Sequence, residues 1–496
     1  MLNSVDFSGR PFHFIGIGGI GMSALAHVLA SRNLPVSGSD LRLSHITDRL
    51  EAQGAHIFNR QQAENLEFFT RATADRVHKS AGLETAGSAK RPPVLPQVVC
   101  STAIGESNAE YRAAVATGCP IFHRSDILAA LMNERKGIAI AGTHGKTTTS
   151  SITGYLLLKA GVDPTIIIGG EVSAWAGNAY VGQSDYVVAE ADESDGSLVK
   201  LSSHIGVITN IELDHPDHYS SLDQVVAIFE QFGSQCGTVI GSLDCPTVRD
   251  RIHLDISYSL EADSDADYIA TDIRERAEAM TATIWERGEK LGDLRVPLLG
   301  LHNLSNTLAA VAVARHLGVS FAAIVTHLPN FQGARRRFEH RGLHNEILFV
   351  DDYAHHPSEI RATLAAAQVQ RQGVLPSGRK RRIVAVFQPH RYSRAAALLD
   401  EFATAFAGVD RLLVTDIYSA GETNTVNISG EKVAGVIAQH QPAEYYSTLE
   451  GIKQTLATSL TPGDIVIFLT AGNLNQIIPE VMAAYQSVPQ PEAALT

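Results

Sequence analysis

Short apolar runs alternate with stretches of helical periodicity along almost the whole chain. Runs such as 186–190 and 383–387 have the length and apolar content of buried strands. Alternation of strands with helices is typical of α/β folds, in which helices pack against parallel sheets. The pattern therefore predicts an α/β protein throughout, and 496 residues are enough for about three domains.

The predicted elements fall into three blocks, which set the expected domain limits at 1–125, 126–333 and 334–496. Predicted strands lie at 98–101, 165–168, 186–190, 207–210, 347–351, 383–387, 412–415 and 465–468. Predicted helices lie at 108–117, 305–317 and 321–328. The polar, alanine-rich segment 70–97 is interpreted as a loop or insertion with little core, and the last ten residues as frayed.

A glycine turn joins an apolar run to the start of a predicted helix at 142–149. Backbone N–H groups at such a turn point toward one place, where the helix dipole also favours negative charge. Lys146 adds a positive charge, and Thr147 adds a hydroxyl suited to Mg²⁺. This indicates a phosphate-binding loop, although Ile140 replaces the first glycine of the common G-x-x-x-x-G-K-[ST] pattern. The alternative is a helix start that carries these residue types by chance.

A second glycine-rich turn, G-I-G-G-I-G at 16–21, lies between a predicted strand and a predicted helix. Asp40 follows about twenty residues later, at the spacing of an acid that contacts a ribose. This combination is typical of NAD-dependent oxidoreductases, yet the turn suits any pyrophosphate, including that of a UDP-sugar. An oxidoreductase would give Lys146 no role, and a P-loop ATPase or GTPase switch would leave the flanking blocks unexplained.

Composition and charge argue against several classes of protein, such as nucleic-acid-binding, disulfide-rich and membrane proteins. The net charge of −13 argues against general nucleic-acid binding. The four cysteines form no C-x-x-C pair, so we expect neither a disulfide framework nor a zinc site. No export signal is visible, and glycines interrupt the apolar segment 12–30, so we expect a cytoplasmic enzyme without membrane insertion. The sequence leaves open whether the chain is a monomer or a homodimer.

Six motifs in a fixed order make the chain similar to the Mur ligase family over essentially its whole length. They are G-T-H-G-K-T-T at 142–148, E-A-D-E-S-D at 190–195, N-I-E-L-D-H at 210–215, H-N-L-S-N at 302–306, D-D-Y-A-H-H-P at 351–357 and Q-P-H-R-Y-S-R at 388–394. The resemblance implies an N-terminal Rossmann-like UDP-sugar domain, a central P-loop-type mononucleotide-binding ATPase domain and a C-terminal Rossmann-like domain that binds the amino acid.

The resemblance also implies a reaction: ATP-dependent amide formation between the lactyl carboxylate of UDP-N-acetylmuramate and L-alanine, with ATP and Mg²⁺ required. The carboxylate must first become an acyl phosphate, because a carboxylate is unreactive toward an amine. The absence of lysine from 220–232 fits the alanine-adding branch of the family. The alternative within the family is a ligase that recycles a murein tripeptide, which shares the later motifs. T-A-G-N at 470–473 departs from the G-A-G form expected there.

The family pattern assigns roles to residues in all three blocks. The implied catalytic residues are Lys146, Glu190, His215 and Arg336, and the implied metal ligands are Thr147, Glu190 and His215. The implied ATP contacts are Gly142, Thr143, His144, Gly145, Lys146, Thr147, Thr148, His302, Asn303, Arg336 and Asp351. The implied UDP-sugar contacts are Gly18, Gly19, Ile20, Gly21, Asp40, Ser101, Thr102, His123 and Arg124. The implied amino-acid contacts are Tyr353, His355, Arg391 and Arg394.

Some of these residues have plainer explanations, which the sequence leaves open. Asn303 would cap a helix that starts near Leu304. Arg391 and Arg394 are three residues apart, a spacing that also suits surface charge on one helix face. The acids at 192–195 have no assigned role and would suit a solvated loop.

Overall fold

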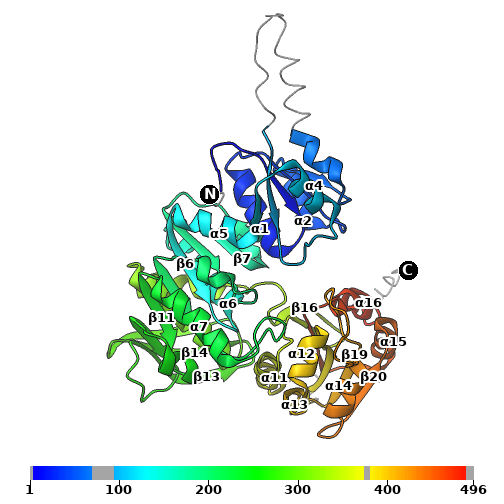
Figure 1. Cartoon of the computed structure of the whole chain (residues 1–496). Coiled ribbons are helices and arrows are strands. Elements are labelled where there is room, and N and C mark those ends of the chain that lie inside the picture. The colour runs from blue at the N-terminus through cyan, green and yellow to red at the C-terminus, as the bar shows by residue number, and fades with distance from the viewer. Residues whose placement is uncertain (1–3, 70–93, 374–379, 487–496) are drawn as a thin grey trace, which may run out of the picture. The chain divides into compact units, whose positions relative to one another are not determined.

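A computed structural model describes residues 4–69, 94–373 and 380–486 (Figure 1). Most of the predicted loop at 70–97 and all of the final ten residues lie outside these ranges. The chain divides into two compact units. The first contains Met1–Ala141, Leu157–Val207 and Ile228–Val239, and the second contains Gly142–Leu156, Ile208–Ala227 and Ile240–Thr496.

The first sheet, blue to cyan in Figure 1, consists of parallel strands. Its spatial order is β3 (His56–Phe58), β2 (Val36–Ser39), β1 (Phe12–Ile15), β4 (Gln97–Cys100) and β5 (Ile121–His123). Its helices are α1 (Ile20–Ser31), α2 (His45–Ala52), α4 (Ala109–Thr117) and α5 (Arg124–Asn133), with the 3-10 turn η1 (Ala63–Glu67). The strand order reverses beside β1, which pairs with both β2 and β4. Ligands of open α/β sheets bind at such a reversal, where the glycine turn at 16–21 begins.

The second sheet has the spatial order β15 (Glu289–Val296), β14 (Ala279–Glu286), β13 (Tyr268–Arg276), β12 (Ile256–Ser259), β11 (Thr238–Ser242), β10 (Ile205–Ile208), β6 (Lys136–Ala141), β9 (Tyr186–Glu190), β7 (Thr165–Val172) and β8 (Gly177–Tyr180). The helices of this part of the chain are α6 (Lys146–Lys159), α7 (Leu222–Ser234), α8 (Pro246–Arg251), α9 (Leu301–His316) and α10 (Phe321–His327). Its 3-10 turns are η2 (Ser173–Trp175), η3 (Ser197–Lys200) and η4 (Leu328–Asn330).

Strands β13, β14 and β15 depart from the predicted parallel pattern, because they form an antiparallel meander. The turn between β14 and β15 consists of Arg287 and Gly288, whose φ angles are 50° and 82°. Positive φ at both positions is typical of the two-residue turns that join antiparallel strands. A short turn of this kind leaves no room for the helix that a parallel connection needs.

The third sheet has the spatial order β16 (Glu339–His344), β17 (Ile347–Asp352), β21 (Asp464–Thr470), β18 (Arg382–Gln388), β19 (Arg411–Thr415) and β20 (Ala443–Tyr446). Its strands are parallel except for β16, which pairs antiparallel with β17 at the edge. The accompanying helices are α11 (Pro357–Arg371), α12 (Tyr392–Ala397), α13 (Leu399–Phe402), α14 (Gly430–Ile437), α15 (Leu449–Ser459) and α16 (Ile478–Ala483), with the 3-10 turn η5 (Leu474–Ile477).

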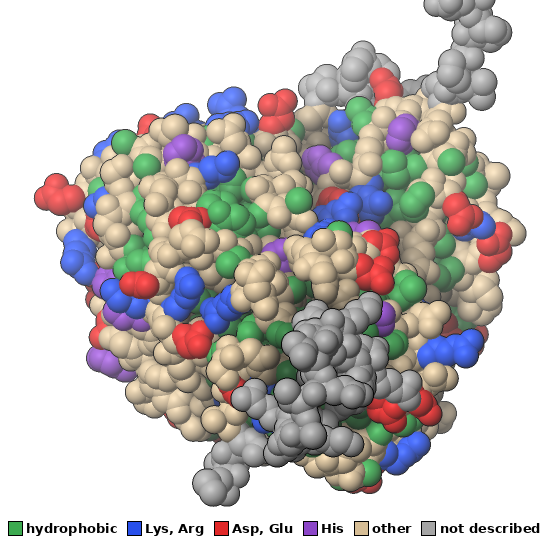
Figure 2. Space-filling model, turned by 90° about the horizontal axis from the view of Figure 1, so that it is seen from above, with side chains coloured by type: hydrophobic (Ala, Val, Ile, Leu, Met, Phe, Trp, Pro, Cys, Tyr) green, Lys and Arg blue, Asp and Glu red, His purple; other side chains and the backbone are tan. Residues whose placement is uncertain are grey.

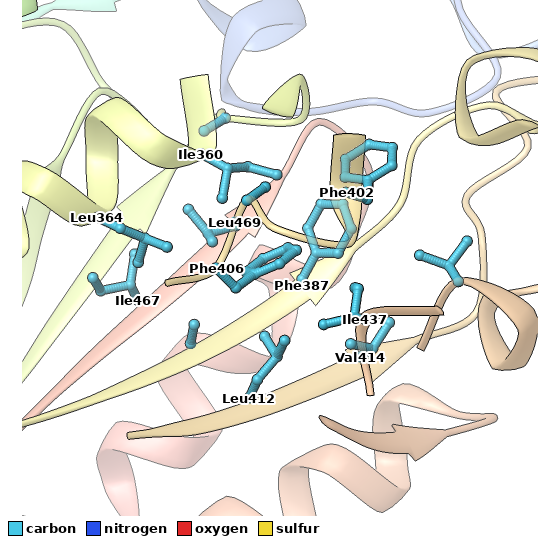
Figure 3. Packing of buried hydrophobic residues seen from close by; sticks show 14 of the residues in the cluster. Ile360, Leu364, Phe387, Phe402, Phe406, Leu412, Val414, Ile437, Ile467 and Leu469 are labelled. Carbon is cyan, nitrogen blue, oxygen red and sulfur yellow. The ribbon is translucent and has the colours of Figure 1, made fainter. Parts of the chain in front are cut away.

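Both faces of this third sheet are buried, as strand β18 shows. Ile383 and Phe387 belong to one apolar cluster, whereas Val384 belongs to another. Successive side chains of a strand point to opposite faces, so a strand covered on both sides is apolar without alternation. In the first cluster Phe387 packs against Phe402 and Phe406, with ring centroids 5.4 and 5.1 Å apart (Figure 3).

The α/β fold predicted from the sequence is confirmed. Each predicted strand coincides with an observed strand whose first residue differs by at most two positions. The helix predicted from 305 begins four residues earlier, at Leu301. None of the described helices combines the length and the apolar character that a bilayer crossing requires. On the face shown in Figure 2, Lys and Arg side chains lie among Asp and Glu side chains rather than in one basic tract.

Candidate functional site

The predicted phosphate loop connects β6 to α6, and the segment after β10 supports it. The N–H groups of Thr143 and His144 donate to the backbone and side-chain oxygens of Asn210, at 3.0 and 2.8 Å. Lys146 Nζ donates to the carbonyl oxygens of Gly142 and Thr143, at 2.7 and 3.0 Å. The ammonium therefore lies over the loop at the start of α6, where an anion meets both its charge and the helix dipole.

Two glycines of the loop have conformations and neighbours that exclude a side chain. Gly142 has a φ of 135° and Gly145 a φ of 82°, both in the left-handed region. A Cβ on Gly145 would clash with the amide of Asn306, and one on Gly142 would clash with the hydroxyl of Thr209. The tight path of the loop thus requires glycine at both positions.

We expect Gly145→Ala to weaken ATP binding at least about tenfold, because the loop must move away from Asn306. Gly161→Ala is a matched control: Gly161 also has a φ of 82°, but nothing lies within 4 Å of an added Cβ. Both substitutions carry the strain of a left-handed alanine, about 1–2 kcal/mol, so their difference isolates the clash. Calorimetric titration with ATP measures both variants, and equal affinities would contradict this account.

Two neighbouring arginines that precede β16, Arg336 and Arg337, contact different partners. Arg337 Nη2 donates to the Thr147 hydroxyl at 3.4 Å. Arg336 donates to the Thr470 carbonyl at 2.5 Å and lies 3.7 Å from the buried carboxylate of Asp351. In the structure, the side chain that contacts the phosphate loop at Thr147 is therefore Arg337, next to the implied catalytic residue Arg336. The family pattern assigned no role to Arg337. Its position next to Arg336 in the sequence was the one indication that it lies near the site.

The candidate adenine contacts lie in the first turn of α9. Because this helix begins at Leu301, the alternative that Asn303 caps a helix start near Leu304 is wrong. Asn303 is buried, and its Nδ2 donates to the Leu299 carbonyl at 2.7 Å. Burial lowers the pKa of His302 to about 4, so its imidazole is neutral at pH 7. A neutral imidazole and an amide suit an uncharged base, and the adenine role stays a prediction.

The candidate amino-acid contacts Tyr353 and His355 follow directly after β17. The guanidinium groups of Arg336 and Arg337 lie over the Tyr353 ring, 4.8 and 5.2 Å from its centroid. His355 Nδ1 lies 2.9 Å from the Tyr353 carbonyl, and its ring meets that of His390 edge to face. Burial lowers the pKa of His355 to about 4, which leaves this imidazole neutral.

Arg391 and Arg394 differ sharply in their surroundings. Arg394 is only 3% exposed and bonds both carboxylate oxygens of Asp214, at 2.8 and 3.2 Å. Burial opposes ionisation of Asp214, but Arg394 holds the pKa of this carboxyl well below its ordinary value. The Arg391 side chain is 34% exposed and bonds Asp217 at 2.6 Å. The surface-charge alternative therefore does not hold for Arg394, whose Nη2 also lies 3.5 Å from Nδ1 of His215.

Glu190, the predicted metal ligand of the first unit, is the last residue of β9. Its Oε2 accepts the N–H of Gly169 at 2.8 Å. Its backbone is in register with Ile140 of the parallel strand β6. The carboxylate therefore stands at the sheet edge where β6 ends, which is the edge at which α/β proteins bind ligands.

Asp40 accepts a hydrogen bond from the backbone of the first glycine turn. Its two carboxylate oxygens accept the N–H groups of Gly18 and Arg42, each at 2.9 Å. Gly19 caps α1, which begins at the predicted contact Ile20. Ser101 and Thr102 directly follow β4. These candidates therefore come from the carboxyl ends of neighbouring parallel strands, as a UDP-sugar site in this kind of fold requires.

His123 and Arg124, where α5 begins, contact acids that had no assigned role. Arg124 Nη2 bonds Asp192 at 2.6 Å, and His123 Nε2 lies 3.5 Å from Asp195. Burial opposes the charge on Arg124, but the two acids outweigh it and raise the pKa of the guanidinium. Two acids of the 190–195 segment thus hold candidate UDP-sugar residues in place instead of forming a solvated loop.

Three models of protein families match successive parts of the chain. "Mur ligase family, catalytic domain" matches residues 11–136, and "Mur ligase middle domain" matches residues 140–314. "Mur ligase, glutamate ligase domain" matches residues 336–472.

Whole-length relatives and solved structures agree with these matches. The chain is 60% identical over 487 residues to the UDP-N-acetylmuramate–L-alanine ligase of Nostoc punctiforme, covering 98% of both chains. It is 58% identical to the enzyme of the same name from Trichormus variabilis, covering 97% of this chain and 98% of that one. The UDP-N-acetylmuramate–alanine ligase of Thermotoga maritima has a similar structure, with a TM-score of 0.77, 26% identity and coverage of 96% and 99%. A murein peptide ligase of Psychrobacter arcticus shares the fold, with a TM-score of 0.68, 22% identity and coverage of 97% and 100%.

Proposed function

Because this chain belongs to the Mur ligase family, we propose that it joins L-alanine to the lactyl carboxylate of UDP-N-acetylmuramate, an ATP-dependent step of peptidoglycan precursor synthesis. The observation that carries the proposal is 60% identity over 98% of both chains to a ligase named for these two substrates. For the tripeptide-recycling alternative, the murein peptide ligase of Psychrobacter arcticus supports the fold alone, at 22% identity. The partners are then small molecules, and the reaction takes place in the cytoplasm.

The proposed reaction has two transfers, both of which need positive charge. A carboxylate oxygen of UDP-N-acetylmuramate attacks the γ-phosphorus of ATP, and ADP leaves. The amine of L-alanine then attacks the acyl carbon, loses a proton and expels phosphate. Bringing the carboxylate to the γ-phosphate places two anions side by side, which Lys146 and Arg337 at the phosphate loop would offset.

Mg²⁺ would supply further charge at the phosphates, and the available side chains suit it. The Thr147 hydroxyl and the Glu190 carboxylate are oxygen ligands, which Mg²⁺ prefers in small number with water and phosphate. His215 offers a nitrogen, which suits Mg²⁺ less well than oxygen does. Following the family pattern, Thr147 and Glu190 would hold the first ion, and His215 with Glu190 would hold a second.

We expect Glu190→Gln to raise the Mg²⁺ concentration needed for half-maximal phosphate release at least about tenfold, because the anionic ligand is lost. A Mg²⁺ titration of the reaction at saturating ATP measures the change. Glu134→Gln is the control, since Glu134 forms an exposed ion pair with Arg32. An unchanged Mg²⁺ requirement in Glu190→Gln would remove Glu190 from the metal site.

Phosphate release tests the reaction as a whole. We expect release from ATP only when UDP-N-acetylmuramate and an amino acid are both present, because the sugar carboxylate is needed to form the acyl phosphate and the amine is needed to expel its phosphate. A screen over single amino acids should give the highest rate with L-alanine, and it also measures competition by glycine and serine. Comparable turnover with a murein tripeptide in place of L-alanine would favour the recycling ligase instead.

A further inference from the structure

A cluster of charged side chains joins the phosphate loop to the start of α11. His144 Nε2 lies 3.3 Å from Glu212 Oε2, and His144 Nδ1 lies 3.4 Å from Glu359 Oε1. An ionised carboxylate can only accept hydrogen bonds, so each ring nitrogen must carry a proton to bond its partner. The two contacts therefore describe a doubly protonated, positively charged imidazole.

Both carboxylates are themselves held by residues at the start of α11. Glu359 Oε2 accepts the N–H groups of His355 and His356, at 3.0 and 3.2 Å, in the capping box of the helix. Glu212 accepts the hydroxyl of Ser358 at 2.7 Å. The two acceptors are thus fixed on either side of the imidazole, and they cannot turn away without breaking other hydrogen bonds.

The electrostatics of the cluster agree with this geometry. Burial disfavours a charged His144, but hydrogen bonds to Glu212 and Glu359 outweigh it and raise the pKa of the imidazole to about 10. Burial likewise disfavours the charged form of Glu212 and by itself would raise its pKa. The contact with His144 outweighs this effect and lowers the pKa of the carboxyl to about 2. Other titratable groups that interact with the two carboxylates are His302, Arg337, Asp352, His355, His356 and Arg394, and Lys146 lies two residues after His144 in the loop.

A metal ion is the competing explanation for these residues. His144, Glu212 and His356 each offer one donor atom, and these atoms lie within 4.8 Å of one another. A metal ligand must be deprotonated, however, and both nitrogens of His144 face carboxylates. The cluster is therefore better described as an imidazolium between two anions than as a metal site.

We propose that Glu212 and Glu359 are positioning residues, which keep His144 cationic and fixed so that it adds to the charge of Lys146 in holding ATP. The choice of ATP as ligand rests on the proposed function. Since Tyr353 and His355 lie beside the same helix start, one structure supports both the phosphate loop and the candidate amino-acid contacts.

The double variant Glu212→Gln/Glu359→Gln tests this inference in the full chain. Glutamine keeps the oxygens that accept from Ser358 and from the capping box, but it removes both charges. The pKa of His144 should then return toward 6.5, so that the imidazole is neutral above pH 7. ATP dissociation constants are measured with Mg²⁺ between pH 6 and pH 9. We expect the ratio of variant to wild type to stay within about twofold at pH 6 and to reach about tenfold at pH 8.5.

Protonation of ATP itself affects both proteins equally and therefore does not change the ratio. Two further variants serve as controls. Adding His144→Asn to the double variant should abolish the pH dependence of the ratio. Glu431→Gln, an exposed acid in the first turn of α14, should match the wild type. If the ratio of dissociation constants is raised equally at every pH, the two acids only support the structure, and the inference is wrong. A ratio of one at every pH would also overturn the inference. L-alanine is absent from this assay, so a wrong acceptor in the phosphate-release screen leaves the inference intact, whereas wild type that binds no ATP defeats both.

Discussion

Replacing Lys146 by alanine is expected to lower phosphate release about 10²- to 10³-fold, because the loop loses the positive charge aimed at the transferred phosphoryl group. In the structure the ammonium bonds the carbonyl oxygens of Gly142 and Thr143, so its position is set before ATP arrives. Charge that is positioned in advance needs no reorganisation during the transfer, which is why one such group has a large effect.

The loss in Lys146→Ala should be concentrated in turnover rather than in folding. The Lys146 ammonium donates to two carbonyl oxygens of the loop, whereas alanine is a better helix former at the start of α6. Lys159→Ala, at the exposed far end of the same helix, is the control and should release phosphate at the wild-type rate. Normal turnover in Lys146→Ala would remove the phosphate loop from the reaction.

Much of the fold was predictable because strand and helix periodicities are local properties. The run at 383–387 predicts a strand, and β18 occupies it with both faces buried. The meander of β13 to β15 was not predicted, because its strand direction depends on a turn of only two residues. Arg287 and Gly288 adopt positive φ there, and an Arg-Gly pair is a weaker turn signal than Asn-Gly.

The site was predictable where a single motif contains both the functional residue and the neighbours that position it, as in the loop that carries Lys146. It was not predictable where the partner comes from elsewhere in the chain. Glu212 is 68 residues from His144, and Glu359 belongs to another block altogether. The one local signal for Glu359 was its place three residues after His356, where an acid completes a capping box. The contact of Arg337 with the Thr147 hydroxyl likewise depends on the path of the backbone, since φ at Arg336 is 58°.

Replacing Arg394 by methionine is expected to lower the free energy of unfolding by about 3–5 kcal/mol, because it leaves the Asp214 carboxylate buried without its partner. The pKa of Asp214 is lowered in the folded protein, so the pair stabilises the fold above the ordinary value of 3.8 and stops doing so as the pH falls through the folded-state pKa. The gap between wild type and variant should therefore persist from pH 5 to pH 8 and close only in acid. Calorimetric unfolding at several pH values measures it.

A second substitution separates this structural effect from alanine binding. Adding Asp214→Asn to Arg394→Met removes the unpaired charge, so much of the lost stability should return while the activity should not. Arg391→Met provides the contrast, because its exposed pair with Asp217 contributes only about 0–1 kcal/mol. If Arg391 holds the alanine carboxylate, its variant keeps wild-type stability and needs more L-alanine for half-maximal rate. Should Arg391→Met unfold as easily as Arg394→Met, the difference in burial between the two arginines would not govern their roles.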